Sequence, residues 1–236
     1  MSNEAPCKQM RILQVTATKP SYCEQVNIRL STILAQTGFV CNAPVQAIAE
    51  KDGFTLTLHE HSRTHETGKT IHVKTYGSRL RLNVYFSKKF LPTGLKAGDF
   101  LAAKFEHGTI TARKLPDANK YYIIGEEAHS PYLLMSGAIL PDAGFEADAI
   151  STVSVVNNEL TIRLWDQQAT DYPEIVKFAR SRKLQIIQPY QSQEVRLKIP
   201  PYLLDAVGFE PGDFAGVSTH HATIKMFKAD LQSLGF

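Results

Sequence analysis

The sequence predicts a mostly β protein assembled from four copies of one short unit. Each copy reads as a strand, a single helical turn closed by Gly and a large apolar residue, and an alternating hairpin. The copies lie near residues 22–60, 78–115, 131–165 and 193–228. A unit of this length is too short to bury a core of its own, so we expect the copies to pair in two domains, 1–118 and 128–236.

The helical turn of each copy fits one way of ending a helix. Gly38, Gly94, Gly144 and Gly208 would each be the left-handed residue just past the helix, and the next residue would pack on the one that heads the last turn. The pairs are Leu34 with Phe39, Phe90 with Leu95, Leu140 with Phe145, and Leu204 with Phe209. Asn42, Gly98, Asp148 and Gly212 follow four residues after each Gly and tolerate positive φ, so two successive chain reversals are predicted.

Alternating apolar residues follow each reversal and predict hairpins with turns at 51–53, 106–108, 157–158 and 219–221. Turn residues at 115–120 mark the expected domain boundary, and residues 121–124 read as a short strand that could bridge the two halves. Between the last two copies, residues 173–180 predict one connecting amphipathic helix with Pro173 in its first turn and Asp171 as its cap.

Charge is distributed unevenly along the chain. Lys and Arg number 5 against 5 Asp and Glu in residues 1–60, 12 against 4 in residues 61–120, and 9 against 14 in residues 121–236. A basic first half next to an acidic second half indicates a division of labour, in which the basic part meets a polyanion.

Composition favours a cytoplasmic protein without a cofactor or metal. The sequence has no apolar run of the roughly 20 residues that a membrane helix needs, and its polar start does not resemble a signal peptide. Three Cys without C-x-x-C spacing read as reduced thiols. The most metal-like cluster is His59, Glu60, His61, His65 and Glu66, but its spacing matches no H-E-x-x-H motif, and a polar connector is the favoured interpretation.

Residues 195–199 and 202–213, together with residues 27–30 and 37–39, resemble the SymE-like toxin family, a branch of the AbrB/MazE swapped-hairpin superfamily. In that superfamily two βαββ units exchange hairpins to build one barrel. Four units would imply two fused swapped-hairpin β-barrels. The resemblance also implies DNA binding, because AbrB-type barrels generally act as transcriptional regulators or antitoxins.

The candidate nucleic-acid interface lies in the second copy. In residues 79–86 the even positions are apolar, while Arg79, Arg81, Asn83 and Tyr85 would share the other face of a strand. This face offers guanidinium groups for phosphate or guanine, an amide for adenine and an aromatic ring for stacking. The predicted binding set is completed by Lys88 and Lys89 in the next loop and by Arg29 at the comparable strand position of the first copy.

The sequence therefore predicts a non-enzymatic DNA-binding protein, with duplex DNA favoured over RNA and no catalytic residues assigned. Its acidic half would self-associate, bind a protein partner or mimic nucleic-acid charge. Two alternatives stay open. One is an RNA-targeting toxin or endoribonuclease, to which His107 beside Glu106 could contribute acid–base chemistry. The other is an interaction protein, an inhibitor or anti-defence factor whose acidic half blocks a partner.

Overall fold

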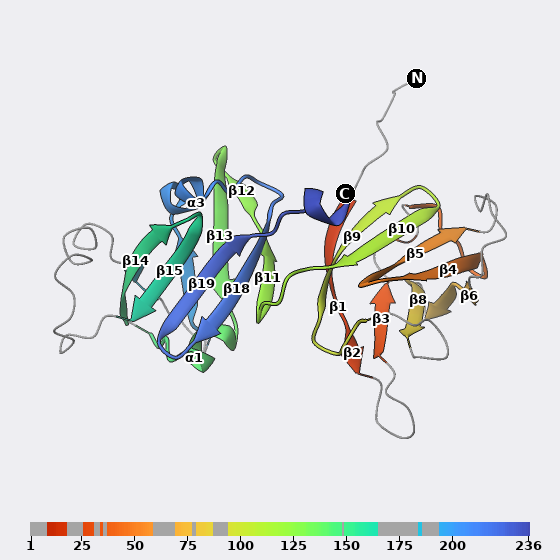
Figure 1. Ribbon diagram of the computed structural model, residues 1–236, viewed down its shortest axis with the longest axis horizontal. Helices are drawn as coiled ribbons and strands as arrows, with labels where there is room; N and C mark the ends of the chain where they lie inside the picture. Colours follow the sequence, from red (N-terminus) through yellow and green to blue (C-terminus); the bar gives the residue numbers. More distant parts are fainter. Residues whose placement is uncertain are drawn as a thin grey trace. The chain divides into compact units, whose positions relative to one another are not determined.

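The computed structural model describes residues 9–17, 26–30, 34, 37–58, 69–76, 79–86, 94–147, 149–164, 184–185 and 194–236. They divide into two compact units: unit 1 comprises Met1–Leu115 with Leu231–Phe236, and unit 2 comprises Pro116–Asp230 (Figure 1). Compared with the expected ranges 1–118 and 128–236, residues 116–127 lie in unit 2 and the last six residues in unit 1. The prediction of a mostly β protein is confirmed.

Unit 1 consists of two antiparallel sheets. The larger has the order β1-β9-β10-β5-β4-β6 and the smaller the order β2-β3-β8-β7. Their strands are β1 (Gln9–Gln14), β2 (Thr16–Ala17), β3 (Val26–Leu30), β4 (Pro44–Glu50), β5 (Gly53–Leu58), β6 (Lys69–His72), β7 (Lys74–Tyr76), β8 (Arg79–Phe86), β9 (Phe100–Glu106) and β10 (Thr109–Lys114).

Unit 2 repeats the large sheet of unit 1 strand for strand, while its small sheet has no counterpart of β7 among the described residues. Its larger sheet has the order β11-β18-β19-β15-β14-β16 and its smaller sheet the order β12-β13-β17. The elements are β11 (Lys120–Ile123), β12 (Gly125–Glu127), β13 (Ser130–Ser136), α1 (Ile139–Asp142), β14 (Ile150–Val156), β15 (Glu159–Leu164), β16 (Leu184–Gln185), β17 (Arg196–Ile199), α3 (Pro201–Val207), β18 (Phe214–His220) and β19 (Thr223–Lys228). A short 3-10 helix, η3 (Gln232–Leu234), follows in the segment assigned to unit 1.

Within each unit the two copies pair with each other. The first strands pair as β3 with β8 and as β13 with β17, and the hairpins pair through β5 with β10 and through β15 with β19. The tip of one hairpin also reaches the helical turn of the other copy: Gly108 N–H donates to the Thr37 carbonyl (2.8 Å) and Ala222 N–H to the Ala143 carbonyl (3.1 Å). None of these sheets closes into a barrel over the described residues, so the barrels remain a prediction of the resemblance.

Each copy begins earlier than the sequence pattern indicated. The edge strands β1 and β11 pair with β9 and β18, which belong to the other copy of the same unit, and β6 and β16 pair with β4 and β14 in the same way. The strand at residues 121–124 therefore completes the large sheet of unit 2. Just after the edge strand, Val15 exchanges backbone hydrogen bonds with Gly98 and Asp99, and Ile124 does so with Gly212 and Asp213.

The predicted helix ending is confirmed in three copies. Gly38, Gly144 and Gly208 have φ of 84°, 83° and 80°. The residue after each Gly donates its N–H to the carbonyl that heads the turn, in the pairs Phe39 to Leu34 (2.9 Å), Phe145 to Leu140 (2.9 Å) and Phe209 to Leu204 (3.0 Å). All six side chains are buried, so the capping contact of each copy is part of the core of its unit.

The second copy departs from this expectation. Gly94 is not in the left-handed region. A Cβ at this position would lie 2.8 Å from Asp52 Oδ1, at the tip of the β4–β5 hairpin, so glycine is needed here for space and not for its φ. The second reversal has positive φ at Asn42, Gly98 and Gly212, as predicted, while Asp148 lies outside the described residues.

Three hairpin turns fall at the predicted places, with positive φ at Asp52, Gly108, Asn157 and Asn158, whereas the fourth lies at 221–222 and not at 219–221, because β18 continues through His220. Each unit has its own apolar core. The predicted connecting helix at 173–180 and the histidine cluster at 59–66 lie outside the described residues. In the described part of the chain, no helix is long and apolar enough to cross a membrane.

Gly38 and Gly208 form a matched pair for testing the role of the hairpin tip. An added Cβ at Gly208 meets nothing within 4 Å, whereas at Gly38 it would lie 2.6 Å from His107 Cε1. We expect Gly208→Ala to cost about 1–2 kcal/mol from left-handed strain alone, and Gly38→Ala to cost about 1 kcal/mol more from overpacking against the imidazole. Chemical denaturation monitored by circular dichroism measures both. Adding His107→Ala should remove the difference, and equal costs for the two single variants would contradict the contact.

We expect Tyr121 to make the stability of unit 2 decrease at alkaline pH. Its side chain is 5% exposed, and its hydroxyl donates to the Pro116 carbonyl (2.9 Å). Burial, reinforced by Asp117, raises the pKa of the phenol well above its ordinary value of 10.0. The neutral form is favoured in the fold, so this stabilisation is complete below about pH 10 and is lost as the pH rises further. Melting temperatures between pH 8 and 11 should therefore fall less steeply for Tyr121→Phe than for wild type, and parallel curves would contradict the assignment.

Candidate nucleic-acid interface

The small sheet of unit 1 brings together strand positions from three segments of the chain. Arg29 on β3 lies directly opposite Asn83 on β8. Toward the other end of β8, Arg81 is opposite Lys74 and Arg79 is opposite Tyr76, both on β7. Residues directly opposite each other in an antiparallel pair share a face of the sheet. The predicted grouping of Arg29 with the Arg79–Tyr85 positions is thus reproduced in the backbone pairing.

The inner face of this sheet is identified by burial. Ile28, Leu30, Leu82 and Val84 are all at most 2% exposed and belong to the core of unit 1. Because strand residues alternate between faces, positions 29, 81, 83 and 85 belong to the opposite face. Asn83 is half-buried there. Lys88 and Lys89, the remaining members of the predicted set, lie outside the described residues.

Sequence reasoning missed two positions of this face, Lys74 and Tyr76. The sequence gives no strand signal at these positions, because β7 spans only three residues and shows no alternation of its own. Only the pairing of β7 with the first half of β8 assigns these positions to the face. The available signal was weak: a Lys and a Tyr separated by one residue just before a strand.

The four strands of this sheet carry a uniform sign of charge. Their sequences contain Arg29, Lys74, Arg79 and Arg81 and no Asp or Glu. Unit 1 as a whole has 16 Lys and Arg against 8 Asp and Glu, a formal charge of +8, whereas unit 2 has 10 against 15, a formal charge of −5. The cationic sheet therefore lies in the cationic unit, which strengthens its attraction for a polyanion.

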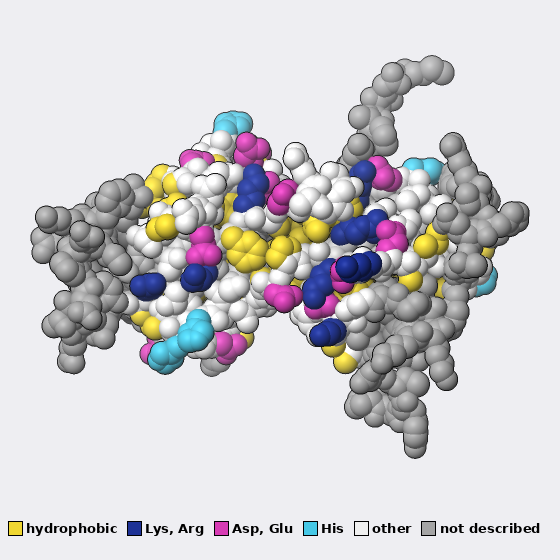
Figure 2. All heavy atoms as spheres, in the orientation of Figure 1, with side chains coloured by type: hydrophobic (Ala, Val, Ile, Leu, Met, Phe, Trp, Pro, Cys, Tyr) yellow, Lys and Arg dark blue, Asp and Glu magenta, His cyan; other side chains and the backbone are white. Residues whose placement is uncertain are grey.

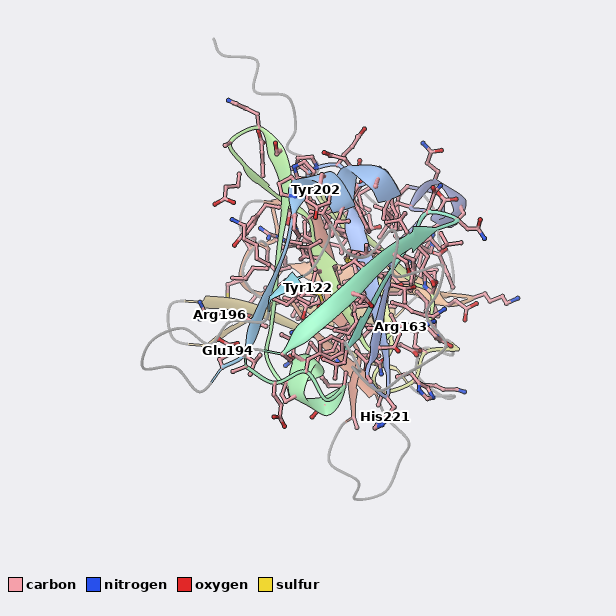
Figure 3. All side chains as sticks on the ribbon, turned by 90° about the vertical axis from the view of Figure 1, so that its left-hand side faces the viewer. Tyr122, Arg163, Glu194, Arg196, Tyr202 and His221 are labelled. Atoms are coloured by element: carbon pink, nitrogen blue, oxygen red, sulfur yellow. The ribbon has the colours of Figure 1, made fainter. Side chains whose placement is uncertain are left out.

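The corresponding sheet of unit 2 is neutralised by its own acidic residues. Lys198 Nζ lies 2.7 Å from Glu127 Oε2 and 4.9 Å from the centre of the Tyr132 ring. The hydrogen bond that Lys198 donates to Glu127 is the main reason why the pKa of Lys198 is raised. Arg196 Nη2 lies 3.1 Å from Glu194 Oε2, and Figure 3 shows these two side chains next to each other at the start of β17. Both cations of this sheet thus have an acidic partner within unit 2.

Three of the five Lys and Arg residues on the strands of the large sheet of unit 1 have an acidic partner. Lys104 pairs with Glu106 (3.0 Å), Arg113 with Glu50 (2.6 Å) and Lys114 with Asp99 (3.0 Å). Figure 2 accordingly shows Lys and Arg side chains interspersed with acidic ones over β9 and β10. Of the two sheets in the described part of unit 1, the small one has strands that carry Lys and Arg but no Asp or Glu, whereas the large one includes Glu50 and Glu106.

Glu106 and His107, the residues considered for ribonuclease chemistry, both make contacts within unit 1. Glu106 pairs with Lys104, and the imidazole of His107 lies against Gly38 at the helical turn of the first copy. Among the residues that the structure describes, no group of three or more His, Cys, Asp or Glu is arranged to hold a metal ion. The pair Glu106 and His107 therefore has a packing role at the tip of the β9–β10 hairpin.

Comparison of the chain with protein-family models, curated proteins and solved structures found no significant match.

Proposed function

We propose that this chain is a DNA-binding protein whose contact surface is the outer face of the β2-β3-β8-β7 sheet, of the kind that serves transcriptional regulation or a toxin–antitoxin pair. The observation that carries the proposal is the backbone pairing of Arg29, Asn83, Arg81 and Lys74 on one face of strands without acidic residues. Phosphate contacts dominate the affinity of proteins for nucleic acid, and Arg and Lys are the residues that make them.

The small sheet of unit 2 can be compared with that of unit 1. The large sheet of unit 2 has the same strand order as that of unit 1, yet the cations of its small sheet are paired with Glu127 and Glu194. A cation that already has a carboxylate partner must lose that partner before it can bind phosphate, so its net gain is small. The strands of the small sheet of unit 1 carry four Lys or Arg residues and no Asp or Glu, which supports assigning nucleic-acid binding to unit 1 and a different role, such as self-association or binding of a protein, to unit 2.

The arrangement of the copies is consistent with the swapped-hairpin architecture of AbrB-type proteins. The first strands of two copies pair with each other, and in each unit the tip of one hairpin donates a hydrogen bond to the helical turn of the other copy. We propose that each unit is a pseudo-dimer of this kind formed within one chain. An internal pseudo-dimer would present one composite face without requiring a second chain.

The double variant Arg79→Ala plus Arg81→Ala tests the proposed face. In a salt series with the full chain and labelled DNA, the slope of log affinity against log salt should become shallower by about two phosphate contacts, roughly 1.4 to 1.8 units. Fluorescence anisotropy at several salt concentrations measures this slope.

Arg196→Ala plus Lys198→Ala in unit 2 is the matched control and should leave the slope unchanged, because both side chains already have acidic partners. An equal loss in the two double variants would contradict the assignment to unit 1. Absence of any DNA binding by the wild-type chain would remove the proposed function. Degradation of labelled RNA by the wild-type chain would favour the ribonuclease alternative instead.

A further inference from the structure

We infer that the outer face of the β2-β3-β8-β7 sheet binds a single-stranded segment of nucleic acid laid along β8. This inference rests on the proposed function and specifies the form of its ligand. It comes from where the aromatic and cationic positions fall on the sheet, which the sequence pattern alone did not show.

The outward positions of β8 form a straight track. Arg79, Arg81, Asn83 and Tyr85 follow one another at intervals of two residues, which is about 7 Å per step and about 20 Å from end to end. The first half of the track is flanked by β7 and the second half by β3, on opposite sides of β8. A polyanion that follows β8 therefore passes Lys74 on one side and then Arg29 on the other.

The two aromatic positions mark the ends of this track. Tyr76 lies opposite Arg79 at one end, and Tyr85 lies opposite Asn27 at the other. The cationic positions Arg81, Lys74 and Arg29 fall between them. A phosphate backbone along the cations would thus be bracketed by two places where a base can stack.

Stacking on a protein aromatic ring requires a base whose face is free. In a duplex the faces of the bases are covered by their neighbours, and only base edges and phosphates are accessible. Unpaired bases offer their faces, and proteins that bind single strands combine aromatic rings with a cationic groove for the backbone. The row of cationic positions along β8, with a tyrosine position at each end, therefore fits a single strand better than a duplex.

The width of the sheet supports the same conclusion. The duplex major groove is about 12 Å wide and admits a helix or a two-stranded ribbon. β8 has β7 on one side and β3 with β2 on the other. Near Tyr85, the strands β2, β3 and β8 lie side by side, which is one strand more than such a ribbon, and their outer axes are about 10 Å apart before side chains are added. The whole face cannot enter the groove and would contact only the phosphate ridges of a duplex.

The test compares two labelled probes with the full chain. One is an oligothymidine of about 12 nucleotides, and the other is a hairpin duplex of about two helical turns. We expect the single strand to bind about tenfold tighter. Tyr85→Leu and Tyr76→Leu should each weaken oligothymidine binding by about tenfold, the loss of one stacked base, and change duplex binding less than about twofold. Tyr85→Phe, which keeps the ring, should bind like wild type.

Tyr132→Leu on the small sheet of unit 2 is the matched control, because Tyr132 is already covered by Lys198, and it should bind oligothymidine like wild type. Circular dichroism and melting temperature report on folding, and the second tyrosine keeps the test informative if one variant does not fold. Equal or tighter binding of the duplex by the wild-type chain would overturn the inference and leave the proposed function standing. Unchanged oligothymidine binding in both folded Tyr→Leu variants would also overturn it. Failure of the wild-type chain to bind either probe would overturn both proposals.

Discussion

The fold depends on the pairing of two copies across their hairpins. A single copy offers one hairpin, one first strand and one helical turn, which is too little apolar surface for an independent core. When β5 pairs with β10 and β3 with β8, the buried faces of both copies close over one core that includes Phe39, Phe54 and Phe105. The contact between hairpin tip and helical turn follows from the same exchange, because each tip extends over the other copy.

This pairing also determines which residues become available for function. Burial of Ile28 and Leu82 sets the phase of β3 and β8, and a shift of one residue would turn every cation on these strands toward the core. The cationic face is thus a consequence of core packing on the other side of the same sheet. Its chemistry can vary while the inner face is preserved, and unit 2 illustrates this: Leu197 and Ile199 keep the core, while Lys198 between them is paired with Glu127.

The two units share the topology of their large sheets and carry opposite net charge. In unit 1 the small sheet gathers positive charge, and in unit 2 the same sheet balances it with carboxylates. Ion pairs on a surface contribute little to stability, so Glu127 and Glu194 affect mainly the electrostatic field of the face. Unit 2 can therefore retain the scaffold without attracting the polyanion that we assign to unit 1.

The sequence by itself determined the features that depend on neighbours along the chain. The four copies, the left-handed Gly beside Phe39, Phe145 and Phe209, the hairpin turns and the alternation in β8 all follow from spacings of a few residues, and the charge asymmetry follows from counting. Tertiary structure decided what depends on partners far apart. It added the edge strands, placed Lys74 beside Arg81, gave Gly94 a spatial role against Asp52, and paired Lys198 with Glu127, which lies 71 positions away. Such pairings depend on which strands meet. Short strands such as β7 have too few residues to show a hydrophobic periodicity from which their pairing partners could be predicted.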